Sequence, residues 1–164
     1  MYLLFNNYRN TINIIIISSI LIVLQSYLPV VKITNSLFLY VDLLLIYLTY
    51  LSLNRKLYSI IIIAFFVGIF QDFIIQNDVI GLYAFLKILS VYFISYLKNI
   101  KSLWNIAFKL FYLICIYFFH YFIYHFIFIN ELTFTLILFI LLESILNVFI
   151  FFIIDKILYQ SNSI

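Results

Sequence analysis

Long runs of apolar residues, separated by short polar segments, fill almost the whole of this 164-residue chain. A helix needs about 20 mostly apolar residues to cross a lipid bilayer, and six runs approach or reach that length. The expected spans cover residues 11–29, 36–53, 57–75, 79–97, 103–129 and 132–155. The runs are continuous rather than alternating, which disfavours membrane-spanning strands. The pattern predicts an all-α integral membrane protein, with one domain of six transmembrane helices over residues 1–164.

Charged residues in the short joints predict how these helices are oriented in the membrane. Short joints make neighbouring helices antiparallel, and cytoplasmic segments of membrane proteins carry an excess of Lys and Arg. One side of the predicted bundle carries six basic residues: Arg9, Arg55, Lys56, Lys98, Lys101 and Lys156. The other side carries one basic residue and two acidic ones, Lys32, Asp78 and Glu131. This asymmetry predicts that the N and C termini both lie in the cytoplasm.

The composition supports a membrane protein and excludes several other classes. Hydrophobic residues make up 68% of the chain and charged residues 9%, whereas soluble domains contain about 25% charged residues. The net charge of +3 follows from topology rather than nucleic-acid binding, because no basic run interrupts the spans. No nucleophile with its base, phosphate-binding glycine loop or zinc spacing is present, so we expect neither an enzyme nor a cofactor. Cys115 is the only cysteine, which excludes an intramolecular disulfide.

Three charged residues inside the apolar runs form the first candidate site. Asp42, Asp72 and Lys87 are expected about 9, 5 and 12 Å from the outer ends of the second, third and fourth spans, from the helical rise per residue. Charge at membrane depth costs about 2.5–3.5 kcal/mol per residue on the insertion scale. We therefore expect an Asp–Lys pair, or a triad with both carboxylates, joining these helices. The sequence leaves open whether this cluster is a packing contact or a substrate or partner site.

Small residues beside this cluster predict close contact between the third and fourth helices. Gly68 precedes Asp72 by four residues and therefore lies on the same helix face. Gly81 and Ala84 form a strip of small residues on the fourth span, and such strips allow two helices to approach closely. We expect the second, third and fourth helices to meet tightly around the charged residues.

A second polar pair is predicted between the fifth and sixth spans. Glu143 lies near the middle of the sixth span, and His120 and Lys109 on the fifth are candidate partners. The sequence favours a hydrogen-bonded pair of His120 and Glu143 that docks two helices over a proton relay by the same residues. Metal binding by His120 and His125 is disfavoured, because residues five apart lie on different helix faces and no third ligand is evident.

The run VGIFQDFIIQNDVIGLYAFLKILSVYFISYL, residues 67–97, resembles the signature region of MreD, the small rod shape-determining membrane protein of bacteria. The matching positions are Gly68, Gln71, Asp72, Gly81, Leu82 and Ala84. Phe85 stands where the family usually has Leu. Upstream, the run beginning at Asp42 resembles the family's Pro-Asp-Leu-x-Leu start of the second span, with Val41 in place of the proline.

This resemblance implies a fold and a function. MreD-like proteins are non-enzymatic partners of MreC, and their fold is similar to the six-helix substrate-binding subunits of energy-coupling-factor vitamin transporters. The resemblance implies a scaffold or regulator of the rod complex, or elongasome, in the bacterial inner (plasma) membrane. That complex links the MreB filament to RodA and a class B penicillin-binding protein, and so controls cell shape and peptidoglycan synthesis. Asp42, Gly68, Asp72 and Gly81 carry over as family-pattern positions without a catalytic role.

Two other functions stay open from the sequence. A vitamin-binding transporter subunit requires an outward-facing ligand cavity and usually an Ala-x-x-x-Ala strip on its first span, but residues 11–29 contain no alanine. A small proton- or ion-coupled carrier would use Glu143 and His120, but no inverted repeat relates residues 1–80 to residues 81–164. The scaffold is therefore the preferred hypothesis.

Overall fold

The computed structural model describes residues 2–27, 31–32, 38–39, 41–75, 79–99, 105–128 and 133–161. Within these ranges the chain forms six helices and one two-stranded antiparallel pair. The elements are α1 (Tyr2–Tyr27), β1 (Val31–Lys32), β2 (Phe38–Leu39), α2 (Leu43–Asn54), α3 (Leu57–Ile75), α4 (Leu82–Asn99), α5 (Ile106–Phe128) and α6 (Phe134–Ser161). The predicted all-helical class is therefore confirmed for the described residues, with a strand pair of two residues per strand as the exception.

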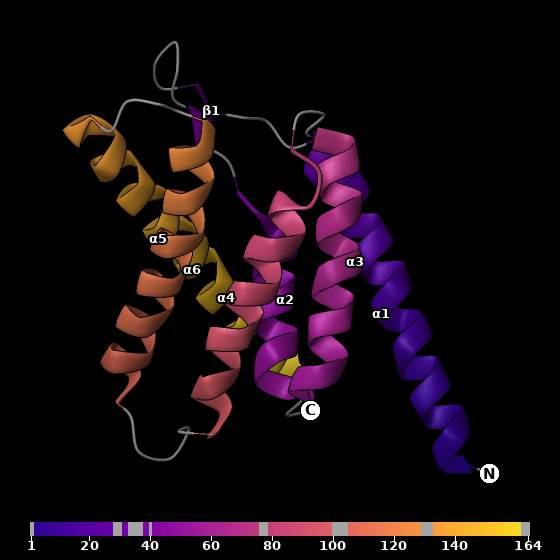
Figure 1. Ribbon diagram of the computed structural model, residues 1–164. Helices are drawn as coiled ribbons and strands as arrows, with labels where there is room; N and C mark the ends of the chain where they lie inside the picture. Colours follow the sequence, from indigo (N-terminus) through magenta and orange to yellow (C-terminus); the bar gives the residue numbers. More distant parts are fainter. Residues whose placement is uncertain are drawn as a thin grey trace.

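Helices α2 and α4 occupy the centre of the bundle. Helix α4 packs against α2, α3 and α5, whereas α2 packs against α1, α3, α4 and α6. The start of α1, the end of α6 and the α2–α3 joint lie at one end of the molecule, and the strand pair lies at the other (Figure 1). Neighbouring helices thus run in opposite directions, as the short joints predicted.

The second helix is shorter than predicted. Helix α3 has the predicted bounds, 57–75, but the predicted span 36–53 contains strand β2 and a helix that begins only at Leu43 and has 12 residues. The side chain of Asp42 accepts a hydrogen bond from the backbone N–H of Leu45 and so caps the helix N-terminus. Asp42 therefore lies at the start of α2 rather than inside it, which corrects its predicted position.

Gly81 fixes the start of α4. Its φ of +97° lies in a region that side-chain-bearing residues rarely adopt, and the helix begins at the next residue, three positions after the predicted start at residue 79. A Cβ atom placed on Gly81 would meet nothing within 4 Å. The prediction that Gly81 allows close helix packing is therefore wrong, and the glycine serves the turn instead.

Helices α3 and α4 approach each other closely at Gly68. A Cβ atom on Gly68 would lie 2.2 Å from Cα and 2.6 Å from the backbone N of Ala84. No rearrangement of a side chain relieves this contact, because both neighbouring atoms belong to the backbone. The predicted close approach is confirmed at this pair of positions.

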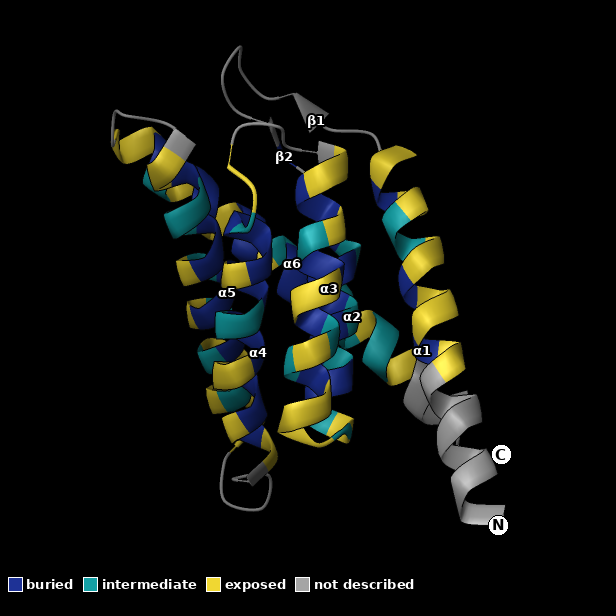
Figure 2. Cartoon of the chain, turned by 45° about the vertical axis from the view of Figure 1, so that its right-hand side comes forward, coloured by how far each residue is buried: buried dark blue, intermediate teal, exposed yellow. Residues whose placement is uncertain are grey.

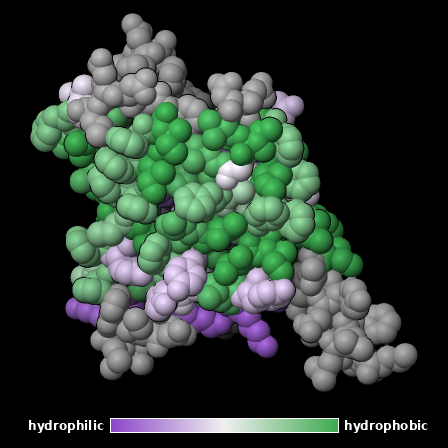
Figure 3. Space-filling model, viewed as in Figure 1, coloured by the Kyte–Doolittle hydropathy of each residue, from purple (hydrophilic) through white to green (hydrophobic). Residues whose placement is uncertain are grey.

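Three of the described helices are long and apolar enough to cross a membrane, in the ranges Leu57–Ile74, Ile106–Ile127 and Phe134–Ile157. The apolar part of α1, Ile12–Tyr27, and helix α2 are shorter apolar helices. Hydrophobic residues cover the middle of the molecular surface, and hydrophilic residues gather along one edge (Figure 3). These are the features of a membrane protein, because an apolar exterior of this extent is stable only against hydrocarbon or another protein.

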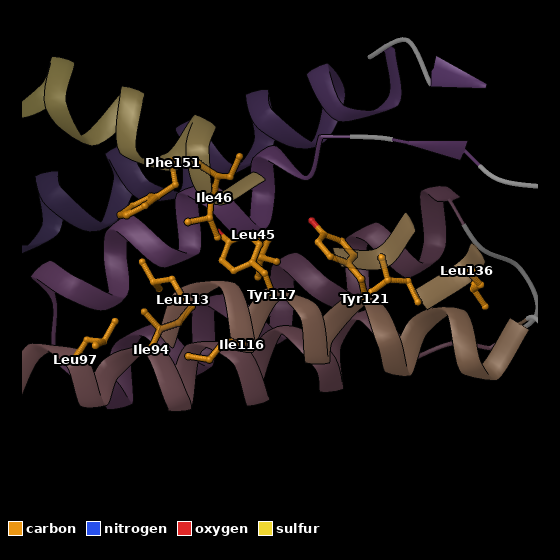
Figure 4. Close-up of a cluster of buried hydrophobic side chains, with 12 residues drawn as sticks. Leu45, Ile46, Ile94, Leu97, Leu113, Ile116, Tyr117, Tyr121, Leu136 and Phe151 are labelled. Carbon is orange, nitrogen blue, oxygen red and sulfur yellow. The ribbon is translucent and has the colours of Figure 1, made fainter. Parts of the chain in front are cut away.

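The interior contains two apolar clusters on either side of α2 and α4. One joins α2, α4, α5 and α6 through residues such as Leu45, Ile94, Tyr117 and Leu136 (Figure 4). The other joins α1, α2, α3 and α4 through residues that include Leu48. Figure 2 shows the buried faces of the helices turned toward this interior and the exposed faces turned outward. The two central helices are thus packed on both sides.

Replacement of Gly68 by Ala is expected to separate α3 from α4. The added methyl group clashes with the backbone of Ala84, and overpacking of this kind costs about 1–3 kcal/mol or more. The measurement is the thermal unfolding midpoint of the detergent-solubilised protein. Ser59→Ala is the control, since Ser59 is exposed on the same helix. A wild-type midpoint for Gly68→Ala would contradict the close approach.

Candidate functional site

A buried ion pair joins the start of α2 to the second turn of α4. Lys87 Nζ lies 2.9 Å from Oδ2 and 3.2 Å from Oδ1 of Asp42. Both side chains are 0% exposed. The sequence predicted a pair of Lys87 with an Asp or a triad, and the partner in contact is Asp42. Because each charge is compensated by the other, most of the desolvation penalty of burying either one is offset.

Asp42 is held by its backbone as well as by its carboxylate. Its backbone N–H donates to Oδ1 of Asn147 on α6 at 2.9 Å. The Asn147 amide is oriented in turn by donating from Nδ2 to the carbonyl of Glu143 at 2.9 Å. Since Oδ1 of Asp42 also accepts from Leu45 N at 2.9 Å, this residue connects α2, α4 and α6.

Gln25 attaches α1 to the same point. Its Nε2 donates to the carbonyl of Val41 at 2.8 Å, and its Oε1 accepts from the backbone N–H of Leu43 at 2.8 Å. The side-chain amide thus pairs with the backbone on both sides of Asp42, where the chain passes from strand to helix. We call the set Gln25, Asp42, Lys87 and Asn147 the polar network. It joins α1, α2, α4 and α6.

Asp72 does not pair with Lys87, which corrects the expected triad. Its carboxylate accepts hydrogen bonds from the backbone N–H groups of Gly81, Tyr83 and Ala84 at 3.0, 2.9 and 3.3 Å. The first N–H groups of a helix have no partner within the helix, and a carboxylate there also interacts favourably with the helix dipole. Asp72 of α3 therefore caps α4.

The positions that match the MreD-like pattern in the sequence act together in this contact between α3 and α4. Gly68 and Asp72 share one face of α3, as predicted, and both contact the first turns of α4. Gly81 provides the turn from which those N–H groups point at the carboxylate, and Ala84 provides the backbone that packs on Gly68. Gln71 is 1% exposed, and its side-chain amide has no hydrogen-bond partner among the described residues.

The predicted pair of His120 and Glu143 is wrong. Nδ1 of His120 lies 3.0 Å from the Ser90 hydroxyl on α4, and its Nε2 has no hydrogen-bond partner among the described residues. Glu143 Oε2 instead lies 3.4 Å from Nε2 of His125. His125 follows His120 by five residues and so lies on a different face of α5, which is the face turned toward Glu143.

No group of three metal-ligating side chains occurs among the described residues. Two grooves of about 410 and 430 Å³ lie elsewhere on the molecule, and neither is lined by a member of the polar network or by Asp72. The charged atoms of the network contact one another and the backbone. The arrangement therefore holds helices together, with every charge compensated by a partner.

The polar network contains two residues that the sequence analysis missed. Gln25 and Asn147 are buried amides, at 8% and 0% exposure, inside the first and sixth apolar runs. The signal was available, because polar side chains within apolar spans usually hydrogen-bond across helices.

No protein-family model, curated protein or solved structure matches this chain.

Lys87→Met is expected to destabilise the fold, because Asp42 then becomes a buried carboxylate without its cation. Breaking one partner of a buried pair costs about 3–5 kcal/mol. Asp42→Asn has a comparable effect through the unpaired Lys87, although Asn still accepts from Leu45 N. The double variant removes both charges. Its loss of unfolding free energy should therefore be clearly smaller than the sum of the losses in the two single variants.

The measurement is a double-mutant cycle on unfolding in detergent. Lys156→Met is the matched control, since Lys156 is exposed on α6 and its variant should unfold like wild type. If the losses of unfolding free energy from Lys87→Met and Asp42→Asn simply added in the double variant, the two side chains would not interact.

Proposed function

We propose that this chain is a non-enzymatic scaffold or regulator of the bacterial rod complex, acting with an MreC-like single-span partner to control cell shape and peptidoglycan synthesis. The observation that carries the proposal is the joint role of the MreD-like positions. Gly68, Asp72, Gly81 and Ala84 meet in one contact between α3 and α4. The spacing of these positions in the sequence is the spacing that the contact between α3 and α4 requires. Because the positions serve helix packing rather than a reaction, they fit a scaffold.

The closed polar network also favours a scaffold over a transporter subunit. A vitamin-binding subunit needs polar side chains that face a ligand cavity, whereas Asp42, Asp72 and Lys87 are each 0% exposed. Asp42 and Lys87 pair with each other, and the Asp72 carboxylate accepts three backbone hydrogen bonds. The helices leave many large apolar side chains exposed, and such outer faces can pack against the membrane helix of a single-span partner.

The proposed topology has six spans in the bacterial inner membrane and cytoplasmic N and C termini. Arg55 and Lys98 lie at the ends of helices that meet at one end of the bundle, where α1 starts and α6 ends (Figure 1), in line with an excess of positive charge on the cytoplasmic side. Strand β1, which contains Lys32, lies at the opposite end. Lys101, Asp78 and Glu131, which contributed to the same expectation, lie outside the described residues.

The test is depletion of the chain in the rod-shaped bacterium that encodes it, combined with affinity purification of a tagged copy. We expect rounded cells and recovery of a single-span MreC-type protein, with RodA and its penicillin-binding protein as weaker companions. Re-expression of the wild type should restore the rod shape, and the Ser59→Ala control should do so equally. Cells of normal shape that lose uptake of a vitamin would contradict the scaffold and favour the transporter subunit.

A further inference from the structure

A basic groove lies between the start of α3 and the end of α4. It has a volume of about 410 Å³ and is lined by Arg55, Lys56 and Lys98, together with Tyr92 and Tyr96 of α4. Lys98 Nζ donates to the backbone carbonyl of Arg55 at 3.1 Å, which ties the two sides of the groove together. Three cationic side chains are therefore held around one concave surface.

These cations, Arg55, Lys56 and Lys98, have no carboxylate partner in the part of the chain that the structure describes. None of the residues that line the groove is acidic. Cations gathered at this density repel one another, and an anion in the groove removes that repulsion.

The position of the groove restricts which anion it fits. It opens at the end of the bundle where hydrophilic residues border the apolar surface (Figure 3), which is the level of lipid headgroups for a membrane protein. Tyr92 and Tyr96 are 41% and 48% exposed, and their hydroxyl oxygens lie 3.2 Å apart. Each tyrosine offers an O–H donor beside an apolar ring. Helix α3 begins at the groove, and its N-terminus favours negative charge.

We propose that this groove binds the phosphate of an anionic phospholipid. The phosphate lies among Arg55, Lys56 and Lys98, and the acyl chains run along the exposed apolar face of α4. One of the two tyrosine hydroxyls donates to the other, and the second donates to an ester or glycerol oxygen of the lipid. This binding site requires only that the chain is a membrane protein, and it does not rest on the proposed role in the rod complex.

The test measures lipids retained by the detergent-solubilised protein after incubation with equal amounts of phosphatidylglycerol and phosphatidylcholine carrying the same acyl chains. Native mass spectrometry should show a preference for phosphatidylglycerol. Each basic residue near an anionic lipid contributes about fivefold to binding. Lys56→Gln, which changes an exposed side chain, should therefore lower the preference about fivefold, and Arg55→Gln/Lys56→Gln about 25-fold.

Lys156→Gln is the matched control, because it removes one exposed positive charge at the same end without lining the groove. It should retain the wild-type preference. Equal retention of both lipids by the wild type, or an equal loss of preference in Lys156→Gln and Lys56→Gln, would overturn the proposal. A third arm adds inorganic phosphate, and full displacement of phosphatidylglycerol by phosphate at equal concentration would assign the groove to a soluble anion instead.

Discussion

The buried ion pair of Asp42 and Lys87 is the interaction on which the rest of the fold depends. Two charges in a bundle core are tolerable only when each is compensated, and here the two oxygens of one carboxylate lie 2.9 and 3.2 Å from one ammonium nitrogen. Gln25 and Asn147 hydrogen-bond to the backbone at and beside Asp42, so α1 and α6 are fixed relative to the pair. A loss of about 3–5 kcal/mol from breaking such a pair is a large share of the 5–15 kcal/mol that stabilises a typical fold.

A second constraint is that the backbone N–H groups in the first turn of each helix need hydrogen-bond acceptors. In a membrane, backbone N–H groups without a partner cost several kcal/mol each, because no water is present to bind them. Helices α2 and α4 each begin at a buried carboxylate: Asp42 caps its own helix, whereas Asp72 caps a helix from its neighbour. The short α2 is stable for this reason, since its first turn needs no contact with water. Asp42 and Asp72 are therefore each explained by a helix terminus, and only Asp42 pairs with the lysine.

Much of this fold follows from the sequence, because continuous apolar runs report helices directly. The six helices, the bounds of α3 and the close approach at Gly68 were all predictable. The start of α2 was not, since residues 36–42 read as a continuation of the apolar run. Its start is set by the local cap at Asp42, together with the pairing of strands β1 and β2 and the contacts that Asp42 makes with Lys87 and Asn147, which the apolar pattern does not show.

The sequence shows which residues belong to the site more readily than it shows which of them contact each other. Asp42, Asp72 and Lys87 were recognised as buried from their position in apolar runs, but the carboxylate that meets Lys87 depends on how the helices rotate. The same limit applies to the histidines, because a helix turns by about 100° per residue. His120 and His125 therefore lie on different faces of α5, and the rotation of the helix decides that Glu143 meets His125. Gln25 and Asn147 are harder to recognise in the sequence, because a neutral amide in an apolar run costs less to bury than a charge and so signals a site less strongly.

The polar network is closed to solvent and holds the helices together. The most direct test of this closure is the rate at which a membrane-permeant amine-reactive reagent acetylates each lysine of the folded protein, measured by mass spectrometry. Lys87 is 0% exposed, whereas Lys56 and Lys98 are exposed. We expect rapid modification of Lys56 and Lys98, with Lys87 modified only after denaturation. Modification of Lys87 at the rate of the exposed lysines would contradict this expectation, because the network would then line an open cavity.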